Sequence, residues 1–142
     1  MSEKIAVHWF RQDLRIKDNP SLEAASKCDS FIPIYILDDT NSGEFKMGSA
    51  SRWWLYHSLN KLNESLGGSL RLFKGDPYEI LPKLVEDYSV SNVFWNRCYE
   101  PWRIDKRRIK KISHFLKSIF TECVSRKGYQ IFFCIIIFKI VM

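Results

Sequence analysis

The stretch VHWFRQDLRIKDNPSL, residues 7–22, contains a strand, a loop and a helix start in direct succession. Lys4–Trp9 is a short run of strand-forming residues, and the polar segment Phe10–Asp18 after it predicts a loop. Asn19 followed by Pro20 is typical of a helix N-cap with proline at the first helical position. The chain is therefore expected to open with one strand–loop–helix unit.

A second strand is predicted at Ser30–Leu37, which reads SFIPIYIL. A run of apolar and β-branched residues of this length is typical of a strand that is buried on both faces of a parallel sheet. Pro33 cannot donate a hydrogen bond to a neighbouring strand, so it predicts that this segment is an edge strand or carries a bulge.

A long helix is predicted to begin at Ser49, because leucines recur at intervals of four, three and four and form one apolar stripe. Gly67 and Gly68 are expected to end it. The stripe consists of Leu55, Leu59, Leu62 and Leu66.

The rest of the pattern continues the alternation of strands and helices. The predicted elements are a strand at Ser69–Phe73, a helix from the N-cap Asp76 to about Tyr88, a strand at Val93–Trp95 and a helix at Arg103–Ser118. Four such units predict an α/β fold with a doubly wound parallel sheet, and 142 residues suffice for a single domain. Ligands of such folds bind at the carboxyl ends of the strands, here in loops Phe10–Arg15, Asp38–Asp39, Lys74–Asp76 and Asn96–Trp102.

Composition excludes several classes of protein. Hydrophobic residues make up 46% and charged residues 27% of the chain, which excludes wholesale disorder. The net charge of +6 comes from one block: residues 1–102 hold 12 basic and 14 acidic side chains, and residues 103–142 hold 10 and 2. The predicted helix Arg103–Ser118 carries six of these basic residues within positions 103–111. It is interpreted as a solvated face, because no aromatic residues alternate with its charges as a nucleic-acid groove requires, and the alternative is that it binds a phosphate backbone.

No export signal precedes the first strand, and the cysteines lack the spacing of a zinc site or redox dithiol. The apolar run at residues 131–142 is shorter than the ~20 residues of a membrane-spanning helix. We therefore expect a cytoplasmic protein without a membrane partner.

Two of the loops carry residues that suit ligand binding. Arg11, Asp13 and Arg15 either tie the first loop down through ion pairs or present arginines to an anionic ligand. In the last loop, Glu100 either accepts hydrogen bonds from a heterocycle stacked on Trp102 or is an ordinary solvent-facing acid.

The sequence contains no glycine-rich phosphate loop, no Ser/His/Asp set, no paired carboxylates and no metal cluster. Cys98 has no histidine near it in sequence to activate it as a nucleophile. The residues alone thus predict a small-molecule-binding domain with no catalytic residue and no metal.

Three segments in order resemble the amino-terminal domain of the DNA photolyase and cryptochrome family. They are VHWFRQDLRIKDNPSL at residues 7–22, LGGSLRLFKGDP at residues 66–77 and VFWNRCYEPW at residues 93–102. Arg52-Trp53-Trp54 also lies where the family often has this run. The resemblance covers roughly Ile5 to Ser118.

The resemblance implies a Rossmann-like antenna domain that holds a folate, a deazaflavin or a flavin. In the family this chromophore passes excitation to FAD in a separate helical domain, which binds DNA with pyrimidine dimers and repairs them as a carbon–carbon lyase. The expected function is therefore light harvesting in a deoxyribodipyrimidine photolyase, with the FAD site absent from this chain and the chain alone inactive. The alternatives are a fragment of a cryptochrome-type blue-light receptor or a stand-alone nucleotide-binding domain.

The chromophore-binding residues follow partly from the resemblance. Tyr35, Arg52, Cys98 and Glu100 match positions at which deazaflavin-binding relatives hold their chromophore, although Cys98 replaces an acidic residue. Trp102-Arg103 stands where folate-binding bacterial relatives carry an Asn-Glu pair, so the type of chromophore stays open. The expected cofactor-binding set is Arg11, Tyr35, Asp38, Arg52, Cys98, Glu100 and Trp102.

Residues 119–142 depart from the family pattern and are rich in isoleucine and phenylalanine. We expect a domain boundary at residue 118, followed by an atypical apolar tail. The tail is interpreted as the product of a frameshift or a truncated gene, and the alternative is a β-strand that completes the sheet.

Overall fold

The computed structural model describes residues 4–96, 98, 120–123 and 132–136. Their strands form one sheet in the order β3-β2-β1-β4-β6-β5. The strands are β1 (Ile5–Phe10), β2 (Ser30–Leu37), β3 (Arg71–Lys74), β4 (Asn92–Trp95), β5 (Phe120–Cys123) and β6 (Phe132–Ile136). The helices are α1 (Pro20–Ser26), the short 3₁₀ turn η1 (Gly43–Phe45), α2 (Ser49–Ser65) and α3 (Pro77–Asp87).

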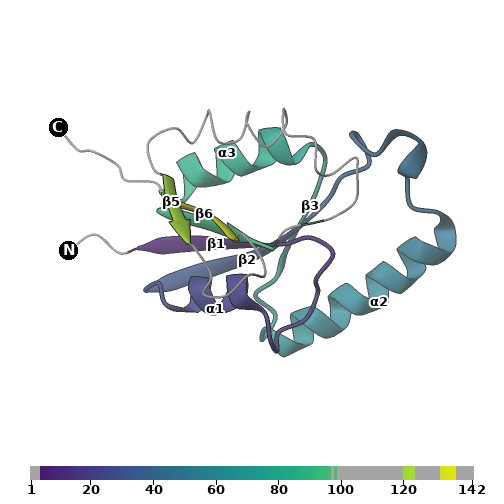
Figure 1. Ribbon diagram of the computed structural model, residues 1–142. Helices are drawn as coiled ribbons and strands as arrows, with labels where there is room; N and C mark the ends of the chain where they lie inside the picture. The colour runs from purple at the N-terminus through teal and green to yellow at the C-terminus, as the bar shows by residue number, and fades with distance from the viewer. Residues whose placement is uncertain (1–3, 97, 99–119, 124–131, 137–142) are drawn as a thin grey trace.

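The predicted α/β fold is confirmed. Strands β1 to β4 are parallel, and α1 and α3 lie on opposite faces of the sheet (Figure 1). Two further strands extend the sheet beyond β4: β6 pairs antiparallel with β4, and β5 pairs antiparallel with β6. Two segments of the apolar tail are therefore part of the sheet.

Local side-chain chemistry sets where two helices begin. The side chain of Asn19 accepts a hydrogen bond from the backbone N–H of Leu22 at 3.1 Å, and Asp76 accepts one from Tyr78 at 2.9 Å. Each cap is followed by a proline at the first helical position, which has no N–H left to satisfy. Both predicted helix starts are confirmed.

The leucine stripe of α2 is also confirmed. Leu59 and Leu62 are buried, and Leu55 and Leu66 pack against the same cluster of core residues. The helix ends before Gly67 and Gly68, which have φ values of +64° and +79° that strain residues with a side chain.

The expectation that Pro33 marks an edge strand or a bulge is wrong. Strand β2 lies between β1 and β3, and Pro33 stands in register with His8 of β1. The proline is tolerated because β3 pairs with β2 only from Ile34 onward, so next to Pro33 the other side of β2 faces no described strand.

Alternate residues of the parallel strands build a core on each face of the sheet. On the α3 face, Val7, Trp9 and Trp95 pack with Leu81 and neighbouring residues. On the opposite face, a second cluster brings the β1–β2 pair and α2 together through Phe10, Leu22, Tyr35, Leu59 and Leu62. Burial on both faces explains why β2 reads as an almost unbroken apolar run.

Several expectations fall on residues that the structure does not describe. The predicted helix Arg103–Ser118, with its basic face, lies outside the described residues, as do Glu100 and Trp102. Among the helices that are described, none combines the length and the apolar character needed to cross a bilayer.

Candidate functional site

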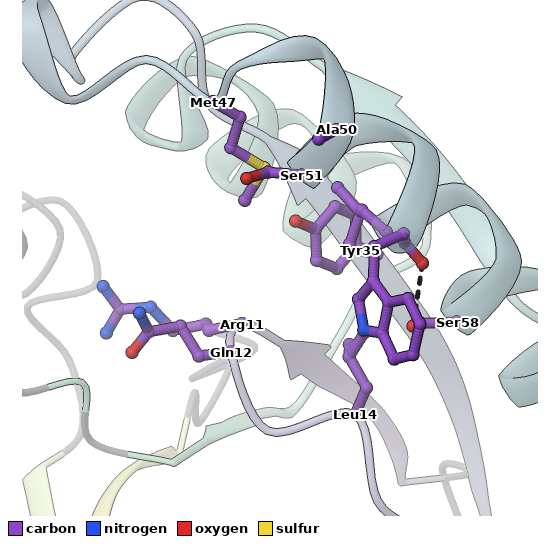
Figure 2. A pocket seen from close by; sticks show the side chains of 10 residues that line it. Arg11, Gln12, Leu14, Tyr35, Met47, Ala50, Ser51 and Ser58 are labelled. Atoms are coloured by element: carbon purple, nitrogen blue, oxygen red, sulfur yellow. Dashed lines mark hydrogen bonds between the residues drawn. The ribbon is translucent and has the colours of Figure 1, made fainter.

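A pocket of about 800 Å³ lies between the loop after β1 and the first turns of α2. In Figure 2 the loop residues Arg11, Gln12 and Leu14 lie on one side. Met47, which precedes α2, and the helix residues Ala50 and Ser51 lie on the other. The complete lining is Arg11, Gln12, Leu14, Tyr35, Met47, Ala50, Ser51, Trp54, Leu55 and Ser58. The pocket thus opens at the carboxyl ends of β1 and β2, where the fold class predicts a ligand.

The lining combines flat or apolar surface with a few polar groups. Tyr35, Trp54 and Leu55 offer apolar or aromatic contact, and Arg11 and Gln12 offer N–H donors. Pockets of a few hundred to about 1,000 Å³ with this composition are typical of sites for small organic molecules. A planar heterocycle with hydrogen-bond acceptors or negative charge matches such a surface.

Arg11 is positioned by an aromatic residue of β1. Its guanidinium carbon lies 4.8 Å from the centroid of the Trp9 ring, a cation–π contact. Trp9 in turn packs against Trp95 of the neighbouring strand, with ring centroids 6.2 Å apart. The cation in the pocket wall therefore rests on the aromatic core of the α3 face.

Arg52 and Asp38, two of the expected site residues, are absent from the pocket lining and tie down the segment between β2 and α2. Arg52 binds Asp39 Oδ1 at 2.8 Å and the backbone oxygen of Met47 at 3.0 Å. Asp38 Oδ1 accepts hydrogen bonds from the backbone N–H groups of Thr40 and Asn41, which is an Asx turn. Arg52 thereby helps to place Met47, which does line the pocket.

The structure thus brings two expected residues, Arg11 and Tyr35, together in the pocket. Cys98 is buried and is not among the lining residues, while Glu100 and Trp102 cannot be placed because they lie outside the described part of the chain.

Several pocket residues escaped sequence reasoning. Met47, Ser51, Trp54 and Ser58 follow one another at intervals of four, three and four. The last three lie on one face of α2, and Met47 lies just before its N-cap Gly48. This second stripe is the signal that could have identified the wall. It is weak, because only two of its four members are apolar.

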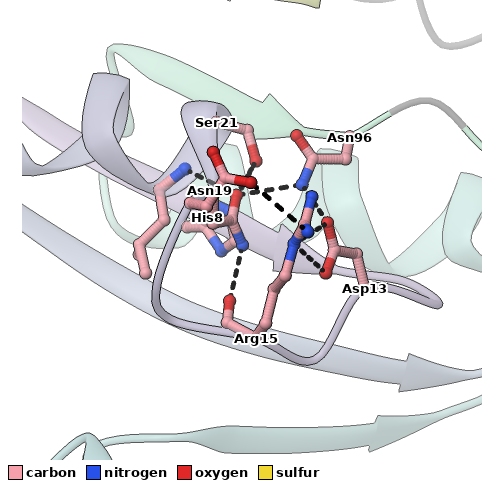
Figure 3. A network of polar contacts seen from close by, with 8 residues as sticks. His8, Asp13, Arg15, Asn19, Ser21 and Asn96 are labelled. Atoms are coloured by element: carbon pink, nitrogen blue, oxygen red, sulfur yellow. Dashed lines mark hydrogen bonds and ion pairs between the residues drawn. The ribbon is translucent and has the colours of Figure 1, made fainter.

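Behind the pocket loop lies a network of polar side chains (Figure 3). The Asn96 amide, at the end of β4, donates to Asp13 Oδ2 at 3.0 Å and to Asn19 Oδ1 at 2.9 Å. Arg15 forms an ion pair with Asp13 at 3.0 Å, and its backbone oxygen accepts from Asn19 Nδ2 at 2.9 Å. Of the two interpretations of the charged loop, internal ion pairing therefore holds for Asp13 and Arg15.

His8 extends this network into the core. Its Nε2 lies 2.8 Å from Ser21 Oγ, and Ser21 donates its own proton to Asn19 Oδ1 at 3.0 Å. His8 must therefore donate from Nε2, which leaves Nδ1 as the unprotonated nitrogen. Burial lowers the pKa of His8 from 6.5 to about 4, so the ring is neutral at physiological pH.

The described residues contain no group of three or more His, Cys, Asp or Glu side chains that is suited to a metal ion.

Comparison with known proteins identifies similar chains. The family model described as DNA photolyase matches residues 6–134. The deoxyribodipyrimidine photo-lyase of Agrobacterium fabrum is 42% identical over 107 residues, which are 71% of this chain and 22% of that protein. Cryptochrome-2 of Arabidopsis thaliana is 37% identical over 103 residues, which are 70% of this chain and 17% of that protein.

The fold has a solved counterpart. The crystal structure of a bacterial class III photolyase from Agrobacterium tumefaciens superposes with a TM-score of 0.71 and 35% sequence identity. The match covers 82% of this chain and 24% of that one. The chain therefore spans between a sixth and a quarter of the length of these relatives.

Proposed function

The chain belongs to the DNA photolyase family, and we propose that its α/β domain is a light-harvesting antenna domain that binds an organic chromophore in the pocket beside α2. In this proposal the domain serves a deoxyribodipyrimidine photolyase. Repair of pyrimidine dimers in DNA, with FAD as cofactor, is assigned to the helical domain that family members carry.

The observation that carries the proposal is the lining of the pocket. Its volume of about 800 Å³ suits a folate, a deazaflavin or a flavin, and Tyr35, Trp54 and Leu55 provide surface for a flat ring. Arg11 and Gln12 supply donors for the oxygen and nitrogen atoms of such rings. These residues fit the group that the family implies.

An antenna domain needs no acid, base or nucleophile. The bound chromophore supplies absorption of near-ultraviolet or blue light and transfer of the excitation energy. The residues of this chain orient the ring, exclude water from its faces and hold it rigidly. Tyr35 is suited to holding the chromophore rigidly, because it is itself buried in strand β2, beside Phe10 of β1.

Two adjacent tryptophans provide a matched test. Trp53 and Trp54 are 63% and 70% exposed and follow each other on α2, but only Trp54 lines the pocket. We expect Trp54→Ala to weaken chromophore binding about tenfold through the loss of one aromatic contact. Trp53→Ala should leave it within about twofold.

The measurement is equilibrium binding of three probes to the full chain: riboflavin, 5-deazariboflavin and 5-formyltetrahydrofolate. The proposal predicts that at least one probe binds and that the two variants differ. Equal losses in both variants, or no binding of any probe, would contradict it.

A second candidate is the antenna domain of a blue-light receptor, favoured by the similarity to Cryptochrome-2. The pocket would bind its chromophore in the same way. The two candidates differ in the complete protein: light-dependent loss of pyrimidine dimers from irradiated DNA supports the photolyase, and its absence in a flavin-loaded protein supports the receptor.

A further inference from the structure

The amide group of Asn96 joins three segments that are far apart in the sequence. It binds Asp13 in the loop after β1 and Asn19 at the start of α1, while its own backbone follows the end of β4. We propose that Asn96 is a positioning residue that clamps the loop at residues 11–18 and so holds the wall of the pocket in place.

The clamp uses the full donor capacity of the amide. An asparagine amide has two N–H bonds, and here Asp13 Oδ2 and Asn19 Oδ1 lie 3.0 and 2.9 Å from the nitrogen. Neither acceptor can be exchanged for another without moving the loop or the helix cap, because Asn19 is buried and also caps α1. The bond to the Asp13 carboxylate is charge-assisted and therefore stronger than a neutral one.

The loop needs such an external contact because it has no helix or strand of its own. Gln12 and Leu14 line the pocket, while Asp13 between them binds Asn96. A bond on one side of the backbone thus determines which groups the loop presents on the other side. Arg15 supports the same carboxylate but is exposed, so its ion pair alone contributes little.

Losing the clamp removes one hydrogen bond from Asp13 and one from Asn19 Oδ1, and water must then replace the lost donor. We expect the loop to open more often and the pocket wall to lose its fixed shape. The effect on ligand binding rests on the proposed function, whereas the effect on the loop does not.

The experiment is amide hydrogen exchange of the full chain, followed by mass spectrometry of peptides that cover residues 11–18. Asn96→Ala should raise the exchange rate of this loop at least about tenfold, the equivalent of one hydrogen bond to a charged group. The matched control is Asn92→Ala: Asn92 is the first residue of β4, the strand that Asn96 directly follows, and it is also half-buried, but its amide donates to Cys28 Sγ. The control should leave the loop unchanged.

A second variant separates hydrogen bonding from shape. Asn96→Asp keeps the size of the side chain but places a carboxylate beside Asp13 and Asn19 Oδ1, which offer it no proton. The loop should exchange at least as fast as in Asn96→Ala. If Asn96→Asp keeps the wild-type protection, or if Asn92→Ala opens the loop equally, the clamp is refuted.

The same variants are then titrated with the probe that the wild-type chain binds best among riboflavin, 5-deazariboflavin and 5-formyltetrahydrofolate. The clamp predicts weaker binding in both Asn96 variants and unchanged binding in Asn92→Ala. An open loop with unchanged affinity would overturn the link to the pocket. If the wild-type chain binds no probe, the proposed function fails, and the exchange rates still decide whether Asn96 orders the loop.

Discussion

Among single residues, His8 has the clearest electrostatic consequence. It is 1% exposed, and its burial lowers its pKa to about 4 against 6.5 for an ordinary histidine. Between these two pH values the unfolded chain binds a proton that the folded chain does not. The free energy of unfolding therefore falls as the pH decreases through this window, by about 3 kcal/mol in total.

The pH dependence can be tested with His8→Gln, which stays neutral and keeps an N–H donor for Ser21. Urea unfolding at pH 7 and pH 5 should show that the wild-type chain loses about 2 kcal/mol more stability than the variant over this interval. Equal losses in the two proteins would mean that His8 is protonated in the folded state or that another group dominates.

At the level of elements, the helix caps of α1 and α3 look alike in sequence but differ in their surroundings. Asp76 is half-buried and accepts from Tyr78. Asn19 is buried, and its Oδ1 accepts from Leu22, Ser21 and Asn96. The Asn19 cap therefore stabilises both the start of α1 and, through Asn96, the loop after β1.

We expect Asp76→Ala to lower the free energy of unfolding by about 1 kcal/mol, the usual effect of removing an N-cap. Asn19→Ala should cost at least about 2 kcal/mol, because it also leaves buried donors without an acceptor. Chemical denaturation measures both, with Asp87→Ala at the exposed end of α3 as a control near zero. Equal costs at the two caps would show that the polar network adds nothing to stability.

For the whole molecule, the sheet determines how distant segments meet. Because the four strands are parallel, the loop after β1 and the end of β4 lie together at the carboxyl ends of the strands. Strand β6 continues the sheet on the far side of β4, with β5 beyond it. Residues that the sequence pattern assigns to an out-of-frame tail thus share a sheet with the domain.

This arrangement predicts the hydrogen exchange of the tail. Because β6 has a neighbour on both sides, its amides at residues 132–136 should be better protected than those of β5, whose described neighbour is β6 alone. Exchange at the rate of an unstructured peptide would contradict the pairing with β4 and favour the frameshift interpretation.

The sequence by itself determined the helices α1, α2 and α3 and the parallel strands β1 to β4, because their signals are local. Asn19-Pro20 and Asp76-Pro77 begin helices through contacts within one turn, and Gly67-Gly68 ends α2 through backbone freedom. The three family-like segments identified the family for the same reason, since a motif is a property of neighbouring residues.

Only the tertiary structure decided which residues form the site. Pro33 was misjudged because its tolerance depends on where β3 begins to pair. Arg52 donates a hydrogen bond to Asp39, which is 13 positions away in the sequence, and Asn96 donates one to Asp13, which is 83 positions away. Such partners depend on which strands and helices lie side by side, and this is fixed by the burial of apolar surface over the whole sheet rather than by any local pattern.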